Sequence, residues 1–197
     1  MTGAPPQGPT PQCPTPWSSR LATEADLVDL ETVMTLAIER LQQGFLDPGQ
    51  IAASRLVMGL DTQLVADRTY FIIETEGRIA GCGGWSRRAT LYGGDHSLSL
   101  RNAAVLDPAQ DSARVRAMYT HPDFARRGVA KMILGLCEQA AAAEGFGAVQ
   151  LMATLSGEPL YLSCGYTEIE RVKSPTRLGE VPLVLMGKRL SVQASRG

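Results

Sequence analysis

The sequence predicts one mixed α/β domain, in which helices pack against a central sheet. Two segments, 27–41 and 129–140, repeat apolar residues at the spacing of an amphipathic helix. Other short runs alternate apolar and polar residues or are rich in β-formers, and glycine or proline separates them. No internal repeat is visible. A chain of 197 residues, with 44% apolar and 20% charged residues, is typical of a single globular domain.

The first 16 residues are interpreted as a tail outside this domain. They contain six prolines and almost no apolar side chains, so they can neither form a helix nor contribute to a core. We therefore expect a disordered or extended tail over 1–16, the domain over 17–190 and a short C-terminal tail over 191–197. A proline-rich ligand for a partner protein is the alternative interpretation of the first segment.

The domain is predicted to begin with a short strand and two helices. The strand lies around 17–21. The first helix begins at Thr23, with Asp26 three residues later as in a capping box. The second helix begins at Asp47, because a cap followed directly by proline is a common helix start. It is expected to run to about Leu60.

The middle of the chain is predicted to form three strands and a long loop. Segment 70–75 is rich in β-formers, and 78–85 returns as its hairpin partner after a Glu-Gly turn. Residues 86–112 are polar and contain glycine, so we expect a long exposed loop that orders over substrate. Segment 114–120 alternates as a strand with one wet face does.

The last part of the chain begins with its clearest helix. This helix starts after Gly128, and glycines at 145 and 147 end it. The remaining elements are, in order, a buried strand at 148–153, a short helix at 158–163, and a closing hairpin of 166–173 with 181–190.

Charge and composition exclude several classes of function. The net charge of −1 and the pI of about 6.1 provide no global positive field for nucleic acid or an anionic membrane. Four arginines are interpreted as parts of solvated faces: Arg87, Arg88, Arg114 and Arg116. There is no membrane-length apolar run and no signal pattern, so we expect a cytoplasmic protein. Whether it forms a homodimer stays open.

Cysteine and histidine spacing does not indicate a metal site. The cysteines are isolated rather than arranged as C-x-x-C, and the chain has two histidines, His96 and His121. We therefore predict no metal cofactor. Cys164 has no local basic partner to lower its pKa, so we do not expect it to act as a nucleophile.

The most informative segment is MYTHPDFARRGVA, from Met118 to Ala130. A strand ends at a proline, and a short loop leads into a helix. The free N–H groups and positive dipole at a helix start bind phosphate oxygens, and Gly128 lets a ligand approach the backbone. The patterns of a nucleotide P-loop and of a dinucleotide fingerprint are both absent. A different diphosphate ligand, such as coenzyme A, fits this cradle.

The segment resembles the GCN5-related N-acetyltransferase (GNAT) superfamily. The family signature is Q/R-x-x-G-x-G/A after a strand, and this chain has Ala125-Arg126-Arg127-Gly128-Val129-Ala130. The family's short helix motif, F/L-Y-x-x-x-G-F/Y, matches residues 160–166 (LYLSCGY). The resemblance covers about 17–190 and implies a mostly antiparallel sheet that is splayed at the cofactor strand. Ala125 departs from the usual Gln or Arg, and Thr154 stands where many members have Asn.

The resemblance also implies where acetyl-CoA binds. The pantetheine arm and thioester would lie along the strand, on the backbone of Met118, Tyr119 and Thr120, whose N–H groups could stabilise the oxyanion. The other implied cofactor-binding residues are Arg126, Arg127, Gly128, Val129, Ala130 and Thr154. An ordinary strand of the sheet is the alternative interpretation of the first group.

Tyr161 is the catalytic residue that the resemblance implies. A phenol can donate a proton or a hydrogen bond to the departing thiolate. The alternative is a tyrosine that only fills space beside Gly165. No general base is identified: Glu74, Asp95 and His96 are candidates by residue type, and a chain of waters could also serve. Three aromatic residues are interpreted as core or pocket walls: Trp17, Tyr70 and Trp85.

These observations predict an enzyme that transfers acetyl from acetyl-CoA to a primary amine. The acceptor is a small molecule or peptide, and transfer is direct, within a ternary complex. Two alternatives stay open, a non-catalytic acyl-CoA-binding sensor or regulatory module, and an interaction protein acting through its tail. The first two helices, the 86–112 loop and the closing hairpin would shape the acceptor site.

Overall fold

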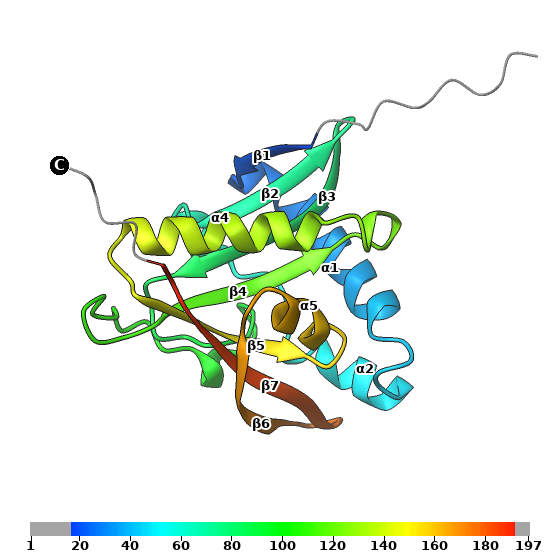
Figure 1. The fold of residues 1–197 in the computed structure, drawn as a ribbon. Coiled ribbons are helices and arrows are strands. Elements are labelled where there is room, and N and C mark those ends of the chain that lie inside the picture. The colour runs from blue at the N-terminus through cyan, green and yellow to red at the C-terminus, as the bar shows by residue number, and fades with distance from the viewer. Residues whose placement is uncertain (1–16, 192–197) are drawn as a thin grey trace, which may run out of the picture.

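A single seven-stranded sheet organises the molecule (Figure 1). The computed structural model describes residues 17–191, so the two predicted tails lie outside the described residues except for Ser191. The strands follow the order β1-β2-β3-β4-β5-β7-β6. Their bounds are Ser18–Leu21 (β1), Tyr70–Thr75 (β2), Arg78–Ser86 (β3), Ala113–Thr120 (β4), Ala148–Thr154 (β5), Thr167–Thr176 (β6) and Gly179–Arg189 (β7).

The sheet is mostly antiparallel and mixed, as predicted. Every neighbouring pair is antiparallel except β4 and β5, which run parallel because α4 connects them. The helices are Leu27–Leu41 (α1), Pro48–Ser54 (α2), Thr62–Ala66 (α3), Val129–Ala143 (α4) and Glu158–Ser163 (α5). Among the described residues, none of these helices is long and apolar enough to cross a membrane.

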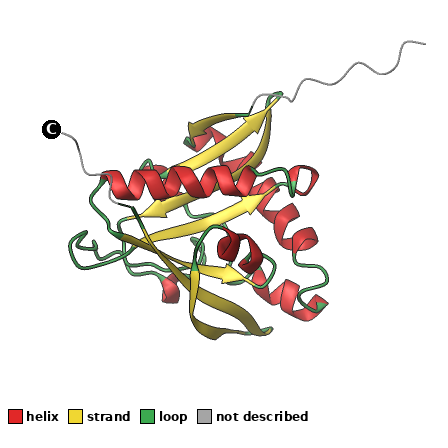
Figure 2. Cartoon of the chain, in the orientation of Figure 1, coloured by secondary structure: helices red, strands yellow, loops and turns green. Residues whose placement is uncertain are grey.

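Helices cover both faces of the sheet, and each face has its own core (Figure 2). Helix α4 buries Val129, Ile133 and Cys137 against one face. Helix α1 buries Leu30 and Met34 against the other face. These are the apolar stripes that the helical spacing predicted, and they bury most of the large side chains of both helices.

The predicted helix starts are confirmed, but the end of the second helix is not. The backbone N–H of Thr23 donates to Asp26 at 2.8 Å, and a 3₁₀ turn at Glu24–Asp26 precedes α1. Asp47 caps α2 as expected. The expectation that this helix continues to Leu60 is wrong, because it ends at Ser54. The Ser54 hydroxyl bonds back to the Gln50 carbonyl at 2.9 Å, and the chain then turns to bury Val57.

Segment 86–112 is a long loop, as predicted, but it is only partly exposed and is held against the domain. Arg88 pairs with Val105 in an isolated bridge, and Thr90 and Asn102 exchange two hydrogen bonds of 2.8 and 2.9 Å. Ser97 is buried and donates to the Leu56 carbonyl at 3.0 Å. The polar side chains of this segment bond to backbone groups, so they fold the segment onto the domain instead of solvating it.

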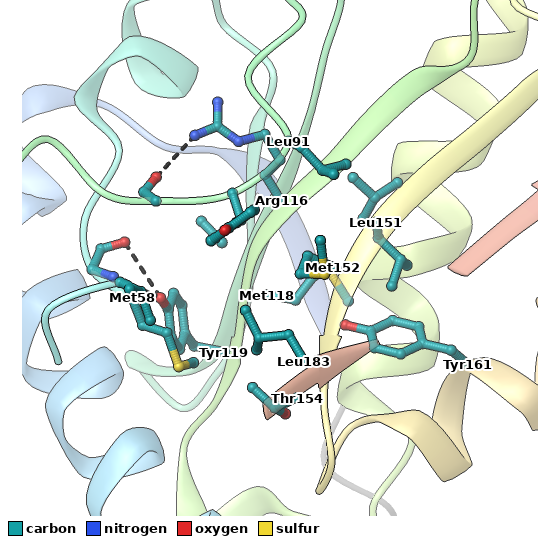
Figure 3. Close-up of a pocket in the computed structure, with 16 residues that line it drawn as sticks. Met58, Leu91, Arg116, Met118, Tyr119, Leu151, Met152, Thr154, Tyr161 and Leu183 are labelled. Atoms are coloured by element: carbon teal, nitrogen blue, oxygen red, sulfur yellow. Dashed lines mark hydrogen bonds between the residues drawn. The ribbon is translucent and has the colours of Figure 1, made fainter. Parts of the chain in front are cut away.

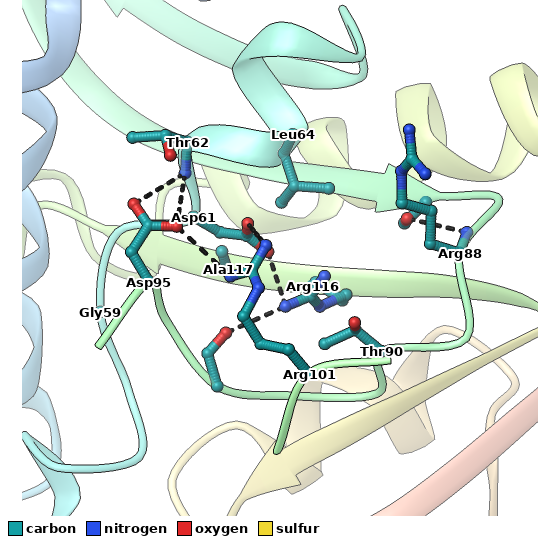
Figure 4. Close-up of polar contacts among 12 residues, drawn as sticks. Gly59, Asp61, Thr62, Leu64, Arg88, Thr90, Asp95, Arg101, Arg116 and Ala117 are labelled. Atoms are coloured by element: carbon teal, nitrogen blue, oxygen red, sulfur yellow. Dashed lines mark hydrogen bonds and ion pairs between the residues drawn. The ribbon is translucent and has the colours of Figure 1, made fainter. Parts of the chain in front are cut away.

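The arginines of β4 do not form a solvated face. Arg116 is 5% exposed and reaches the fully buried carboxylate of Asp61 at 2.6 Å. Arg101 joins the same cluster, with contacts of 3.0 Å to Asp61 and 3.3 Å to Asp95 (Figure 4). Arg114 is half-buried and contacts Gln150. The solvated interpretation fails because each side chain has a partner distant in sequence.

The remaining pair of arginines also forms ion pairs at the surface. Arg87 donates to both carboxylate oxygens of Glu144 through Nε and Nη2, and Arg88 bonds Asp67 at 2.7 Å. These contacts pin the start of the 86–112 segment to α4 on one side and to the end of α3 on the other.

Candidate active site

The sheet is splayed between β4 and β5. The two parallel strands pair over three positions, from Ala113 opposite Val149 to Val115 opposite Leu151. Beyond that point β4 continues to Thr120 and β5 to Thr154 without pairing to each other. The facing backbone edges of the two strands therefore border an opening in the sheet (Figure 1).

A pocket of about 90 Å³ occupies this opening (Figure 3). Its walls come from β4, β5, β7 and α5 and from two loops, 57–59 and 91–93. Most of the lining residues are apolar, among them Met58, Leu91, Met118, Met152 and Leu183, although about half of the exposed wall surface is polar. None of the described residues that line it is an Asp, Glu, His or Lys. The pocket therefore combines apolar side chains with polar surface, and its described lining offers no carboxylate or imidazole to bind a cation.

A β-bulge shapes the pocket side of β4. Cys82 pairs with Tyr119 and Gly84 with Arg116, so two residues of β4 lie opposite Gly83 alone. Ala117 takes a left-handed conformation at this point, with φ of +50°. Such a conformation is unfavourable for a residue with a Cβ, and bulges of this kind re-aim backbone and side-chain groups near active sites.

The loop between β4 and α4 presents a row of free N–H groups. Arg126 and Gly128 both have positive φ, +64° and +86°, and Gly128 caps the helix. Within residues 17–191, the N–H groups from Arg126 to Lys131 have no hydrogen-bond acceptor. Successive free N–H groups in such a turn form a concave site for an anion, and the dipole of α4 adds to it. The loop thus has the cradle geometry expected from the sequence.

Gly128 is required by the backbone rather than by packing. A Cβ placed on it would have no neighbour within 4 Å, so the space beside it is open to a ligand. Its φ of +86° is one that glycine adopts without strain.

The two arginines of the loop differ in how they are held. Both are exposed, and neither has an acidic partner among the described residues. The Arg127 guanidinium lies over the rings of Trp17, at 5.4 Å, and Phe124, at 5.6 Å. These cation–π contacts fix the charge of Arg127 beside the cradle. Trp17 packs edge-on to Phe124, which agrees with its interpretation as a wall residue.

Tyr161 lies on α5 with its hydroxyl directed into the pocket (Figure 3). The residue is 7% exposed, and its ring packs edge-on to Tyr166 with centroids 5.7 Å apart. No residue of the described chain hydrogen-bonds the hydroxyl. Burial raises the pKa of Tyr161 well above its ordinary value. The phenol therefore keeps its proton over the whole physiological range and has it free to donate.

Thr154 lies at the end of β5 and also lines the pocket. Its hydroxyl accepts from the Gly157 N–H at 3.2 Å and contacts the Ser156 hydroxyl at 3.1 Å. These bonds stabilise the turn into α5, so Thr154 positions the helix that carries Tyr161.

The three base candidates lie outside the pocket lining. Glu74 pairs with Arg20 at 3.0 Å on the outer strands. Asp95 accepts from the Thr62 N–H and pairs with Arg101. His96 is exposed and lies against the backbone of Gly59. Geometry thus assigns two of the candidates to ion pairs and leaves the third on the surface.

Sequence reasoning missed two polar side chains of the pocket lining that hold its loops in place. The Tyr119 hydroxyl accepts from the Gly59 N–H at 3.0 Å, and Arg116 donates to the Gly93 carbonyl at 2.9 Å. Each bond ties a pocket loop to β4. No local motif signals these contacts, because each one joins segments far apart in the sequence.

Comparisons with known proteins agree with this architecture. A family model described as an acetyltransferase (GNAT) domain matches residues 66–168. No curated protein matches the chain. The match in the family model includes β2 through α5 and hence the bulge, the cradle and Tyr161.

Several solved structures share the fold at low sequence identity. The ribosomal-protein-S18-alanine N-acetyltransferase of Escherichia coli is 15% identical, with a TM-score of 0.55 over 92% of this chain and 98% of its own. The PaiA N-acetyltransferase of Thermoplasma acidophilum, in complex with coenzyme A, is 11% identical, with a TM-score of 0.60 over 88% and 99%. YncA of Salmonella typhimurium, with acetyl-CoA, is 15% identical, with a TM-score of 0.58 over 92% and 98%.

Proposed function

The chain belongs to the GNAT family of acetyltransferases, and from this we propose that it transfers the acetyl group of acetyl-CoA to a primary amine of a small molecule or peptide. Transfer is direct, within a ternary complex of enzyme, acetyl-CoA and amine. The observation that carries the proposal is the convergence of three features at one opening of the sheet. These are the free N–H groups of the cradle, the unpaired edge of β4 and the hydroxyl of Tyr161.

The residues present fit coenzyme A. The pyrophosphate would accept from the N–H groups of residues 126–130, with Arg126 and Arg127 adding positive charge. The pantetheine arm would then follow the unpaired backbone of β4 at Met118, Tyr119 and Thr120 into the pocket. The PaiA and YncA structures, which contain coenzyme A and acetyl-CoA, share this fold and support the assignment.

The thioester supplies the acetyl group, and the chain's own groups stabilise the charge that develops. When the amine attacks the thioester carbonyl, its oxygen becomes negative. A backbone N–H at the bulge, that of Met118, would donate to this oxygen in a site shielded from water. The attacking nitrogen gives its extra proton to solvent, and collapse of the tetrahedral intermediate breaks the carbon–sulfur bond and leaves a thiolate. The Tyr161 hydroxyl points into the pocket and would donate to that sulfur.

The raised pKa of Tyr161 determines how it assists. A phenol whose pKa lies above that of a thiol does not give up its proton completely to the thiolate. Its main contribution is then a hydrogen bond that strengthens as negative charge develops on sulfur. The Tyr161 assignment favours catalysis over a purely binding role, because a sensor has no need of a donor at this point.

No residue lining the pocket among those described can act as a base for a protonated amine. We infer that the acceptor enters uncharged, or loses its proton to water, before it attacks. The dependence of kcat/KM on pH should then follow the pKa of the amine used rather than a fixed pKa of the protein.

The decisive experiment combines binding with a substrate screen. Acetyl-CoA binding is measured by calorimetry, and release of the coenzyme A thiol is followed with alkylamines, amino acids, polyamines, aminoglycosides and peptides. We expect binding, and thiol release with at least one class of amine. If acetyl-CoA does not bind, the proposal is wrong. If it binds but no amine accelerates thiol release, the chain is a binding module.

A further inference from the structure

Tyr70 makes a hydrogen bond that crosses two strand boundaries of the sheet. It lies on β2, is 1% exposed, and its hydroxyl donates to the backbone carbonyl of Ala117 on β4 at 2.8 Å. Strand β3 lies between the two. The hydroxyl is also 3.3 Å from the Cys82 sulfur, but its single hydrogen goes to the nearer and stronger acceptor, the carbonyl.

Glycine at position 84 makes this reach possible. A Cβ on Gly84 would come within 2.7 Å of the Tyr70 ring carbon Cδ2 and within 2.7 Å of the Thr69 carbonyl oxygen. The ring of Tyr70 therefore lies across β3 in space that any other residue would fill. Its neighbour Gly83 makes similar room, because a Cβ there would come within 2.5 Å of the Met118 sulfur. Because these two residues of β3 are glycines, β3 can pack closely against the bulge of β4.

The carbonyl that Tyr70 holds belongs to the strained residue of the bulge. Ala117 has φ of +50°, a conformation that costs roughly 1–2 kcal/mol for a residue other than glycine. Ala117 packs with the α1 core and Met118 packs with the α4 core, and both residues line the pocket. The peptide between the two residues consequently passes from one face of the sheet toward the other.

We propose that Tyr70 is a positioning residue for acetyl transfer, because it fixes the peptide that joins Ala117 to Met118. In a planar trans peptide the C=O and the following N–H point in opposite directions. Anchoring the Ala117 carbonyl on the Tyr70 side therefore aims the Met118 N–H away from Tyr70, toward the pocket and the thioester carbonyl. This role rests on the proposed function.

The surroundings of Tyr70 suit a permanent donor. Burial raises the pKa of its phenol well above the ordinary value, so the hydroxyl stays protonated. The buried thiol of Cys82, whose pKa burial raises to about 12, is likewise neutral and can donate to the phenol oxygen. No water is needed to complete this set of bonds, and the Ala117 carbonyl keeps one orientation.

The test compares Tyr70→Phe with the native protein, using two ligands. Acetyl-CoA has the thioester carbonyl, and the S-ethyl thioether of coenzyme A lacks it. We expect Tyr70→Phe to lower kcat by about 10- to 100-fold. This reduction is no larger than the one that follows removal of a whole oxyanion-hole donor. It should also weaken acetyl-CoA binding relative to the thioether, while affinity for the thioether stays unchanged. Equal weakening of both ligands, or an unchanged kcat, would overturn the role.

Thr69→Val is the matched control. Thr69 is buried beside Tyr70 and donates its hydroxyl to the Leu64 carbonyl at 3.3 Å, away from β4. Its loss removes one buried hydroxyl of the same region, so it should lower stability without changing kcat or the preference for acetyl-CoA. A fall in kcat as large as that of Tyr70→Phe would show that any buried hydroxyl here has this effect, and would contradict a specific role.

A measurement on the native protein covers the case in which Tyr70→Phe does not fold. The Met118 amide resonance should shift more on binding acetyl-CoA than on binding the thioether. Equal shifts would contradict the claim that the Met118 N–H points toward the thioester carbonyl. Gly84→Ala keeps the hydroxyl but displaces the ring, and should reproduce the selective loss of kcat. The proposed function fails separately, if the native protein neither binds acetyl-CoA nor transfers its acetyl group.

Discussion

Asp61 and Arg116 form an ion pair of 2.6 Å in which the side chains are 0% and 3% exposed. Arg116 lies on the pocket strand β4, and Arg101 adds a second cation to the same carboxylate (Figure 4). Arg116 also donates to the Gly93 carbonyl, so the cluster joins β4 to the loop that forms one wall of the pocket.

Replacing Asp61 should therefore cost far more stability than replacing an exposed carboxylate. Asp61→Asn leaves the buried Arg116 without its counter-charge, and we expect the free energy of unfolding to fall by roughly 3–5 kcal/mol. Asp123→Asn is the control, since Asp123 pairs with Arg78 at 2.9 Å while both are half exposed. It should change stability by about 0–1 kcal/mol. Urea unfolding measures both, and similar losses in the two variants would contradict this account.

The 86–112 segment should be protected from hydrogen exchange before any ligand binds. The Ala89 N–H donates to the Ala104 carbonyl at 2.9 Å, and the Leu106 N–H to the Arg87 carbonyl at 2.8 Å. We expect slow exchange at these two amides and faster exchange at Ser99, near the exposed turn. Amide exchange followed by NMR in the free protein measures this. Uniformly fast exchange over the segment would instead restore the mobile lid expected from composition.

Helix starts could be predicted from the sequence, whereas the tertiary contacts of the 86–112 segment could not. Helix starts at Thr23 and Asp47 and the stripe of α4 were predictable, because capping and periodicity are local properties. The fold of 86–112 was not, because its polar residues bond to backbone groups that only the tertiary structure brings near. Arg116 is an example: its partners Asp61 and Gly93 lie on other segments of the chain.

The site divides in the same way. The cradle at 126–130 and Tyr161 lie in contiguous motifs, so the residue pattern identified them as candidates. The Tyr70–Ala117 bond left no pattern except the glycine at 84, whose reason is visible once the ring is seen to cross it. Residues that touch a ligand tend to be grouped in motifs, whereas those that orient the backbone are scattered over the sheet.

Gly128 offers a test of the cradle that separates binding from folding. Its φ of +86° means that a β-branched residue would strain the backbone as well as block the ligand. Gly128→Val would therefore not separate a loss of stability from a loss of binding. Asparagine tolerates this conformation better. Gly128→Asn should weaken acetyl-CoA binding at least about 10-fold, roughly 1.4 kcal/mol, in calorimetry.

Gly77→Asn is the control for this substitution. Gly77 also has positive φ, +72°, and a Cβ there would meet nothing within 4 Å, but it lies in the hairpin turn between β2 and β3. The two variants should lose similar amounts of stability, and Gly77→Asn should bind acetyl-CoA normally. If Gly128→Asn also binds normally, the pyrophosphate does not lie against this turn.

Tyr161→Phe tests the donor to the departing thiolate. The ring and its edge-on contact with Tyr166 remain, and only the hydroxyl that points into the pocket is lost. If the hydroxyl acts mainly in the transition state, kcat should fall by about 100-fold, roughly 3 kcal/mol, while affinity for acetyl-CoA barely changes. A loss confined to KM would instead indicate that the hydroxyl contributes to uniform binding.

Tyr166→Phe is the matched control, since it removes a buried hydroxyl from the other ring of the same pair, outside the pocket lining. Its kcat should stay within a few-fold of the native value, which is about 1 kcal/mol or less.

The dependence of kcat on pH is a second test of the role of the Tyr161 hydroxyl. Burial raises its pKa above the ordinary value, so the protonated donor persists as pH rises through the range where a free phenol would ionise. Native kcat should therefore not decline between about pH 8 and pH 10, the ordinary pKa of tyrosine. Tyr161→Phe should give a profile of the same shape at a lower level, because the proton of this residue is never lost in that range. Measurements on one amine, at viscosities that show chemistry to be rate-limiting, make the comparison direct. An unchanged kcat in the variant across this range would assign Tyr161 to packing against Tyr166 and leave the thiolate to be protonated by water.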